Sequence, residues 1–143
     1  MSTLVSALMQ LSLLTTSGST YDQAYKVTNE TGRPLVVLVG ADWCPGCQTM
    51  KVSVIPQLQR RGSLKSVAFA TVNTDHQQKL ANRLMQGSSI PQLIMFVKTD
   101  NGWQRKQIIG PRSVPEIEAF IAQGSGKDTP AKPQSNARLV KTP

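Results

Sequence analysis

The sequence lacks features on which several large classes of protein depend. In its 143 residues, no apolar stretch reaches the ~20 residues of a membrane-spanning helix. Aromatic residues make up only 5% of the chain, which is too few for the stacking surface of a single-strand nucleic-acid-binding protein. The net charge of +8 is spread out, and no block of like charges is longer than two residues, as at Arg60-Arg61. We therefore predict neither a transmembrane span nor a nucleic-acid partner.

Cysteine is scarce as well. The chain holds only Cys44 and Cys47, so at most one disulfide can form, and a secreted scaffold stapled by several disulfides is excluded. A bridge between these two residues would close a very short loop and remove little entropy from the unfolded chain, so stabilisation explains the pair poorly. With 39% hydrophobic and 17% charged residues, the chain suits one folded domain with terminal segments.

The first 19 residues carry no charged side chain and place leucines at helical spacing. Two interpretations fit this segment. It is either a signal peptide, which would take the protein to the periplasm or outside the cell, or a short amphipathic helix of a cytoplasmic protein. The basic flank expected of a signal peptide is missing, so the sequence leaves the compartment open.

Residues 20–123 alternate between helical and strand patterns. The first half is predicted to contain a helix over 20–31 capped by Thr20, a buried strand over 35–39, a helix beginning at Pro45 that Pro56 kinks or ends, and a second buried strand over 67–72. The second half is predicted to contain a helix capped by Asp75, a strand over 93–97, a hairpin turn at 100–102, an edge strand over 103–109, and a helix from Ser113 to Gly124. This order predicts an α/β domain with a central mixed β-sheet flanked by helices on both faces. Residues 124–143 are predicted to form a disordered basic tail.

The residues that could carry out a reaction lie where the first strand meets the next helix, in Cys44-Pro45-Gly46-Cys47. A cysteine at a helix N-terminus faces unpaired backbone N–H groups and the positive end of the helix dipole. Both favour the thiolate, which is the nucleophile in disulfide exchange. A second cysteine one turn later is placed to attack the mixed disulfide that the first one forms.

This motif, preceded by Asp42-Trp43 and a buried strand, resembles the active site of the thioredoxin family. Ile90-Pro91, just before a strand, resembles the cis-proline segment of that family, and Gly110 falls where its members carry a glycine. The resemblance covers residues 20–123. It implies a thioredoxin-like fold and thiol–disulfide exchange with protein disulfide or dithiol substrates. It also implies that the chain is a monomer, that it needs no cofactor beyond its own dithiol, and that a separate redox partner regenerates it.

The resemblance also implies roles for single residues. Cys44 would be the attacking cysteine and Cys47 the resolving one. Pro91 would follow a cis peptide bond, and the backbone of Ile90 would pair with an extended substrate segment. Trp43, Pro45 and Gly46 would complete the surface that binds the substrate, with Trp43 shielding one side of the Cys44 sulfur.

The chain departs from the family pattern at three places. The family carries a buried aspartate six residues before the first cysteine, where this chain has Leu38, and a lysine where this chain has Thr71. Without them Cys47 has no internal base, which leaves removal of its proton to water or to Asp42. The dipeptide between the cysteines is Pro-Gly instead of Gly-Pro, and this pair tunes the thiolate.

Two other interpretations of the cysteine pair remain open. The first is a non-catalytic module that keeps the fold and binds partners in the groove beside Pro91. The second is a metal or cluster shared between two chains, because one chain offers only two cysteines and His76, and zinc needs four ligands. We predict no metal site within one chain, and we expect His76 to be an exposed residue at the start of a helix.

Overall fold

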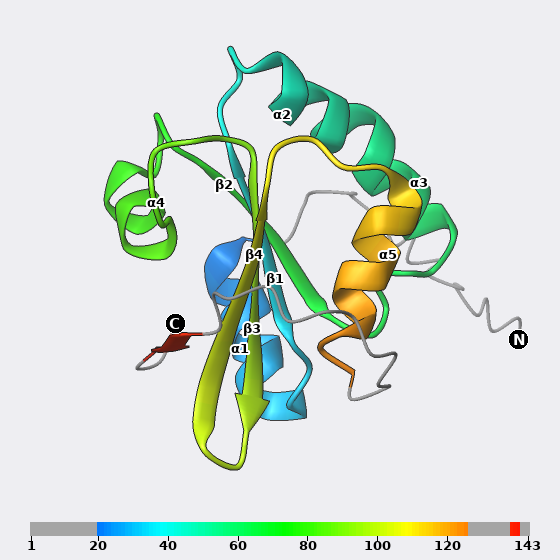
Figure 1. Cartoon of the computed structure of the whole chain (residues 1–143), viewed down its shortest axis with the longest axis vertical. Helices are drawn as coiled ribbons and strands as arrows, with labels where there is room; N and C mark the ends of the chain where they lie inside the picture. The colour runs from blue at the N-terminus through cyan, green and yellow to red at the C-terminus, as the bar shows by residue number, and fades with distance from the viewer. Residues whose placement is uncertain (1–19, 126–137, 141–143) are drawn as a thin grey trace, which may run out of the picture.

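A computed structural model describes residues 20–125 and 138–140, so the prediction for residues 1–19 lies outside the described residues. The described chain forms a mixed sheet with the strand order β2-β1-β3-β4-β5 (Figure 1). The strands are β1 (Leu35–Gly40), β2 (Ala68–Asn73), β3 (Gln92–Thr99), β4 (Gly102–Ile109) and the short β5 (Arg138–Val140). β1 runs parallel to β2 and antiparallel to β3, and β3 and β4 form an antiparallel hairpin. The predicted mixed sheet is confirmed.

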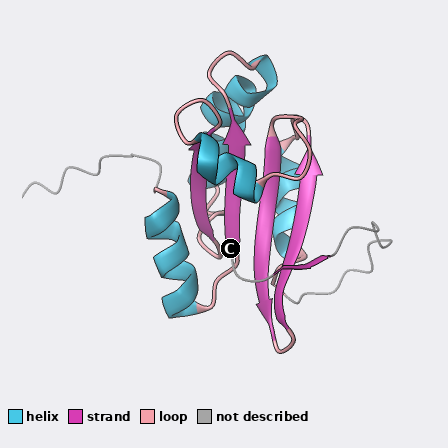
Figure 2. Ribbon diagram, turned by 90° about the vertical axis from the view of Figure 1, so that its left-hand side faces the viewer, coloured by secondary structure: helices cyan, strands magenta, loops and turns pink. Residues whose placement is uncertain are grey.

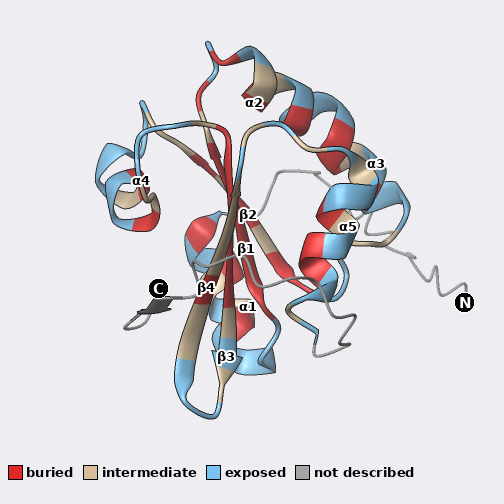
Figure 3. Cartoon of the chain, in the orientation of Figure 1, coloured by how far each residue is buried: buried red, intermediate tan, exposed pale blue. Residues whose placement is uncertain are grey.

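Helices cover both faces of this sheet (Figures 1 and 2). They are α1 (Tyr21–Thr31), α2 (Pro45–Thr49), the π-helical turn η1 (Met50–Val54), α3 (Ile55–Arg60), α4 (Gln78–Leu84) and α5 (Val114–Ala122). One core cluster joins α1 and α4 to the first face, and a second joins η1, α3 and α5 to the opposite face. β1 lies between the two clusters and is buried from Leu35 to Val39, as its unbroken apolar run predicts (Figure 3).

Short-range interactions define the helix ends, including the predicted cap at Thr20 and the predicted start at Pro45. Thr20 and Ser113 both form capping boxes, in which the residue three positions later bonds back to the cap. Gly32 ends α1 in the left-handed conformation, with φ of 73°. Pro45 occupies the first position of α2, where its missing N–H costs nothing.

One of the two predicted effects of Pro56, and the predicted burial of one strand, differ from what the structure shows. The helix that starts at Pro45 does not end at Pro56 but continues to Arg60, so of the predicted kink or end, the end is excluded. Because Ile55 bonds to the carbonyl of Met50, five residues back, the helix widens to a π-turn just before the proline, which itself has no N–H to donate. The strand β2 is only half-buried, with buried and intermediate residues alternating, because it is the edge strand next to β1.

The opposite edge of the sheet also differs from the prediction. We predicted residues 103–109 as an edge strand and residues 124–143 as a disordered tail. Instead, β5 pairs antiparallel with the first part of β4, from Trp103 opposite Val140 to Arg105 opposite Arg138. The remainder of the predicted tail beyond residue 125 lies outside the described residues.

Candidate functional site

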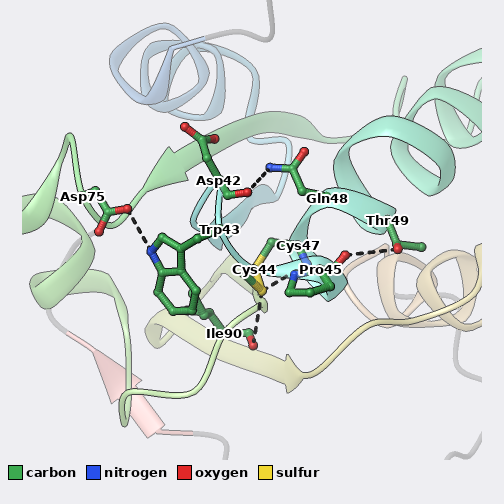
Figure 4. Close-up of a disulfide and its surroundings, with 9 residues drawn as sticks. All are labelled: Asp42, Trp43, Cys44, Pro45, Cys47, Gln48, Thr49, Asp75 and Ile90. Atoms are coloured by element: carbon green, nitrogen blue, oxygen red, sulfur yellow. Dashed lines mark hydrogen bonds between the residues drawn. A yellow bond between two sulfur atoms is a disulfide. The ribbon is translucent and has the colours of Figure 1, made fainter.

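The site lies at the C-terminal end of β1, where the chain turns into α2. Cys44 and Cys47 are joined there by a disulfide, with their Cα atoms 5.2 Å apart (Figure 4). Both side chains are nearly covered, with exposed fractions of 6% and 5%. The two predicted cysteines therefore form a disulfide where α2 begins.

Cys44 caps this helix with its own sulfur. The backbone N–H of Cys47 donates to Cys44 Sγ at 3.2 Å, and the N–H of Gln48 donates to the carbonyl of Cys44 at 3.0 Å. The same amide and the positive end of the helix dipole would stabilise a thiolate on Cys44 once the disulfide is reduced. The geometry thus favours Cys44 as the nucleophile of the pair.

The predicted proline segment faces the disulfide from the start of β3. The Ile90–Pro91 peptide bond is cis, and the Ile90 carbonyl oxygen lies 3.9 Å from Cys44 Sγ (Figure 4). Gly110, which has a φ of 88°, donates its N–H to the Pro91 carbonyl at 2.9 Å and ties this segment to the end of β4. The structure therefore joins Gly110 to the Ile90–Pro91 segment and places the Ile90 carbonyl beside Cys44.

Gly46 and Trp43 lie on the same side of the molecule as this segment. A Cβ on Gly46 would lie 3.2 Å from Pro111 Cγ and 3.5 Å from Pro91 Cδ, so glycine keeps this approach open. Trp43 is 70% exposed, and its indole N–H donates to Asp75 Oδ2 at 3.0 Å. An indole that exposed offers an apolar contact surface next to the disulfide.

Asp75 has a different role from the one predicted. It does not cap α4, whose cap is Gln77; instead its carboxylate holds the indole of Trp43. His76 is exposed as predicted, although it lies in the turn before α4, and its Nε2 lies 3.8 Å from Asp42 Oδ2. Both contacts join residues more than thirty positions apart, so no local pattern indicates them.

Gly40 is a site residue that the sequence analysis missed. It is the last residue of β1, and a Cβ built on it would lie 2.9 Å from both Cβ and Sγ of Cys47. Only glycine therefore allows the strand to pass this close to Cys47. The only sequence signal is that a glycine directly follows the apolar strand.

Gln92, immediately after Pro91, is a second missed residue. It is fully buried, and its side-chain amide donates to the Gln86 carbonyl at 3.0 Å and to the Gly87 carbonyl at 3.4 Å. Its Oε1 accepts from the N–H of Gln86 at 3.4 Å. One side chain thus closes the loop that leads from α4 to the cis-proline segment.

Leu38 and Thr71, the positions of two family departures, are register partners on β1 and β2. Both line a cleft of about 100 Å³ that also reaches Cys47. Leu38 is buried and carries no charge, so the interior behind Cys47 holds no carboxylate from this position.

Within residues 20–125 and 138–140, no three histidine, cysteine or acidic side chains gather as a metal site would require. No helix in the described part of the chain is long and apolar enough to cross a bilayer.

Comparison with known proteins agrees with this geometry. A family model described as thioredoxin-like matches residues 16–98, which is more than half of the chain. The solution structure of a thioredoxin from Thermus thermophilus is 25% identical with a TM-score of 0.62, covering 76% of this chain and 85% of that chain. A thioredoxin from Trichomonas vaginalis is 26% identical with a TM-score of 0.58, covering 74% of this chain and 92% of that one. No curated protein matches the sequence.

Proposed function

Because the chain belongs to the thioredoxin-like family and has its fold, we propose that it catalyses thiol–disulfide exchange with protein substrates through Cys44 and Cys47. The observation that carries this proposal is the disulfide itself. It joins two nearly buried cysteines on the first turn of a helix, and the carbonyl of Ile90 lies 3.9 Å from the sulfur of Cys44. Thiol–disulfide exchange needs no further cofactor, because the dithiol carries the two electrons.

The reaction begins with the reduced protein. The Cys44 thiolate attacks one sulfur of a substrate disulfide, the substrate S–S bond breaks, and the other substrate sulfur leaves as a thiolate. Cys47 then loses its proton and attacks Cys44 Sγ. This step forms the Cys44–Cys47 disulfide, breaks the mixed disulfide and releases the second substrate sulfur. A separate dithiol partner must reduce the protein before the next cycle, and the same steps in reverse would oxidise a substrate dithiol.

The Ile90–Pro91 segment is proposed to hold the substrate across the site. An extended peptide can pair with the Ile90 backbone, as in the addition of a strand to an exposed edge. Its sulfur would then lie beside Cys44, with the exposed indole of Trp43 on one side and Gly46 on the other. Backbone pairing of this kind would allow substrates of many sequences to bind, because its hydrogen bonds do not involve the substrate's side chains.

The proposal is tested with three variants. Cys47→Ser should accumulate mixed disulfides through Cys44, visible as adducts that a reducing agent releases. Cys44→Ser should lose exchange activity and form no such adducts. The double variant is the control for non-covalent binding. Partners that remain bound to the double variant, together with a fully active Cys44→Ser protein, would overturn the proposal in favour of a binding module that uses the groove beside Pro91.

The reduction potential of the pair gives the preferred direction of electron flow. It is measured by equilibration against a thiol buffer and read as an alkylation mass shift. A value near about −270 mV would assign a reductase, and a value above roughly −180 mV an oxidant or isomerase. A pair that does not cycle at all would contradict the proposed function.

A further inference from the structure

A cleft of about 100 Å³ opens behind Cys47, on the side of β2. Its lining includes Cys47 but not Cys44, Trp43, Ile90 or Pro91, which face the proposed substrate. A substrate bound at the cis-proline segment would therefore leave this cleft open. The resolving cysteine has a route to solvent that is separate from the substrate side.

The cleft is suited to hold water. A single water needs about 10–15 Å³ of such space and two to four polar partners, so this volume holds several. Thr71, Asn73, Gln77 and Gln48 line it with polar side chains. Cys47 is only 5% exposed, and burial disfavours a charged thiolate, so a proton acceptor and a nearby positive charge would each favour its deprotonation.

Two charged residues line the cleft, Asp42 from the loop after β1 and Lys51 from η1. The carboxylate of Asp42 lies 3.8 Å from His76 and points away from the two sulfurs (Figure 4). Lys51 follows Cys47 by four residues, one helical turn, and so lies on the same side of the helix. Lys51 is exposed and, like most lysines and arginines in the described part of the chain, forms no ion pair, so no carboxylate neutralises its charge.

We propose that Lys51 is a positioning residue that stabilises the Cys47 thiolate across this cleft, and that water in the cleft takes up the Cys47 proton in the resolving step. The inference rests on the proposed thiol–disulfide exchange. In that step the proton passes from Cys47 to water, the Cys47–Cys44 bond forms, and the bond between Cys44 and the substrate sulfur breaks. The electron pair leaves with the substrate as its thiolate.

The test follows the two sulfur steps separately. The reduced protein is mixed in a stopped-flow instrument with dithiobis-nitrobenzoate, an aromatic disulfide whose thiolate is coloured. The first equivalent of colour reports the attack by Cys44, and the second reports the attack by Cys47 on the mixed disulfide. The rate of the second phase is measured over a series of pH values for the wild type, Lys51→Gln, Lys51→Arg and Lys98→Gln.

Lys51→Gln should slow the second phase about threefold near neutral pH and move its pH profile upward by about half a pKa unit. Lys51→Arg should keep the wild-type pH profile of the second phase, because arginine keeps the positive charge. Lys98→Gln, a change of the same charge near the hairpin turn, should leave both phases unchanged. The difference between the wild type and Lys51→Gln should shrink at 1 M salt, where the Debye length is only about 3 Å.

The outcomes separate this inference from the proposed function. A wild-type protein that releases no second equivalent would contradict thiol–disulfide exchange itself. Normal release of both equivalents, with the same second-phase profile for Lys51→Gln and the wild type, would overturn the role of Lys51 alone. Asp42→Asn should keep a second phase at least as fast as the wild type; a slower one would identify Asp42, and not water, as the proton acceptor.

Discussion

Gly40→Ala tests how closely the end of β1 approaches the resolving cysteine. The added Cβ would lie 2.9 Å from both Cβ and Sγ of Cys47, closer than real Cβ atoms come to their neighbours. The strand has little freedom to retreat, since Gly40 is in register with Asn73 and accepts a hydrogen bond from Thr74 at 2.9 Å. We therefore expect Cys47 to move, at a cost of about 1–3 kcal/mol for overpacking.

The cost should differ between the two redox states. In the disulfide form, the bond to Cys44 fixes Cys47 Sγ, so both close contacts persist. In the dithiol form, Sγ can rotate away, and only the contact with Cβ remains. If the oxidised state loses about 1.4 kcal/mol more than the reduced state, the thermodynamic cycle raises the reduction potential by about 30 mV. The variant should be a stronger oxidant than the wild type.

Two measurements check this expectation. Urea denaturation of the oxidised and the reduced protein gives the loss of unfolding free energy in each state, and equilibration with a thiol buffer gives the potential. Gly32→Ala is the control, because Gly32 has a φ of 73° and no atom within 4 Å of an added Cβ. It should lose stability equally in both states and keep the wild-type potential. An unchanged or more negative potential for Gly40→Ala would refute the reasoning.

Two further predictions concern parts of the fold that support the site. Gln92→Leu should lower the unfolding free energy by about 2 kcal/mol and raise the KM for a protein disulfide, because it leaves the backbone groups of Gln86 without their partner; wild-type stability in urea would contradict this. Hydrogen bonds from Arg61 and Ser63 lower the pKa of Glu118 from 4.5, so its stabilising effect is complete above about pH 4.5 and is lost as the pH falls through the lowered pKa. Glu118→Gln should therefore be less stable than the wild type at neutral pH, and the difference should shrink in acid; a constant difference in thermal unfolding down to acid pH would count against this ion pair.

The parts of the fold that the sequence predicted are those fixed by local chemistry. The cap at Thr20, the start of the last helix at Ser113 and the unbroken apolar run of β1 each depend on residues a few positions apart. The order of these elements then restricts the connection between β1 and β2 to a parallel crossover. The cysteine motif could be placed for the same reason, because a strand followed by Pro45 puts Cys44 at the helix N-terminus.

The predictions fail where contacts between residues far apart in the sequence determine the local structure. Asp75 has the residue type and position of a helix cap, but the indole of Trp43 binds its carboxylate and α4 begins later. The polar composition of β4 is typical of an edge strand, yet β5 pairs with its first residues from more than thirty positions away. Neither of these partners is visible in the local sequence.

Leu38 and Thr71 connect the sequence analysis to the chemistry of the site. The two residues are register partners on β1 and β2. An unpaired charge at the buried Leu38 would be costly, whereas Thr71 is only half-buried. Leu38 therefore keeps the core behind Cys47 neutral and supplies no proton acceptor there. In the structure both line the cleft that Cys47 shares with Lys51. If water in that cleft accepts the Cys47 proton, the rate of the resolving step should depend on the pH and salt concentration of the surrounding solution. The single exposed Lys51 could then alter this rate through its charge.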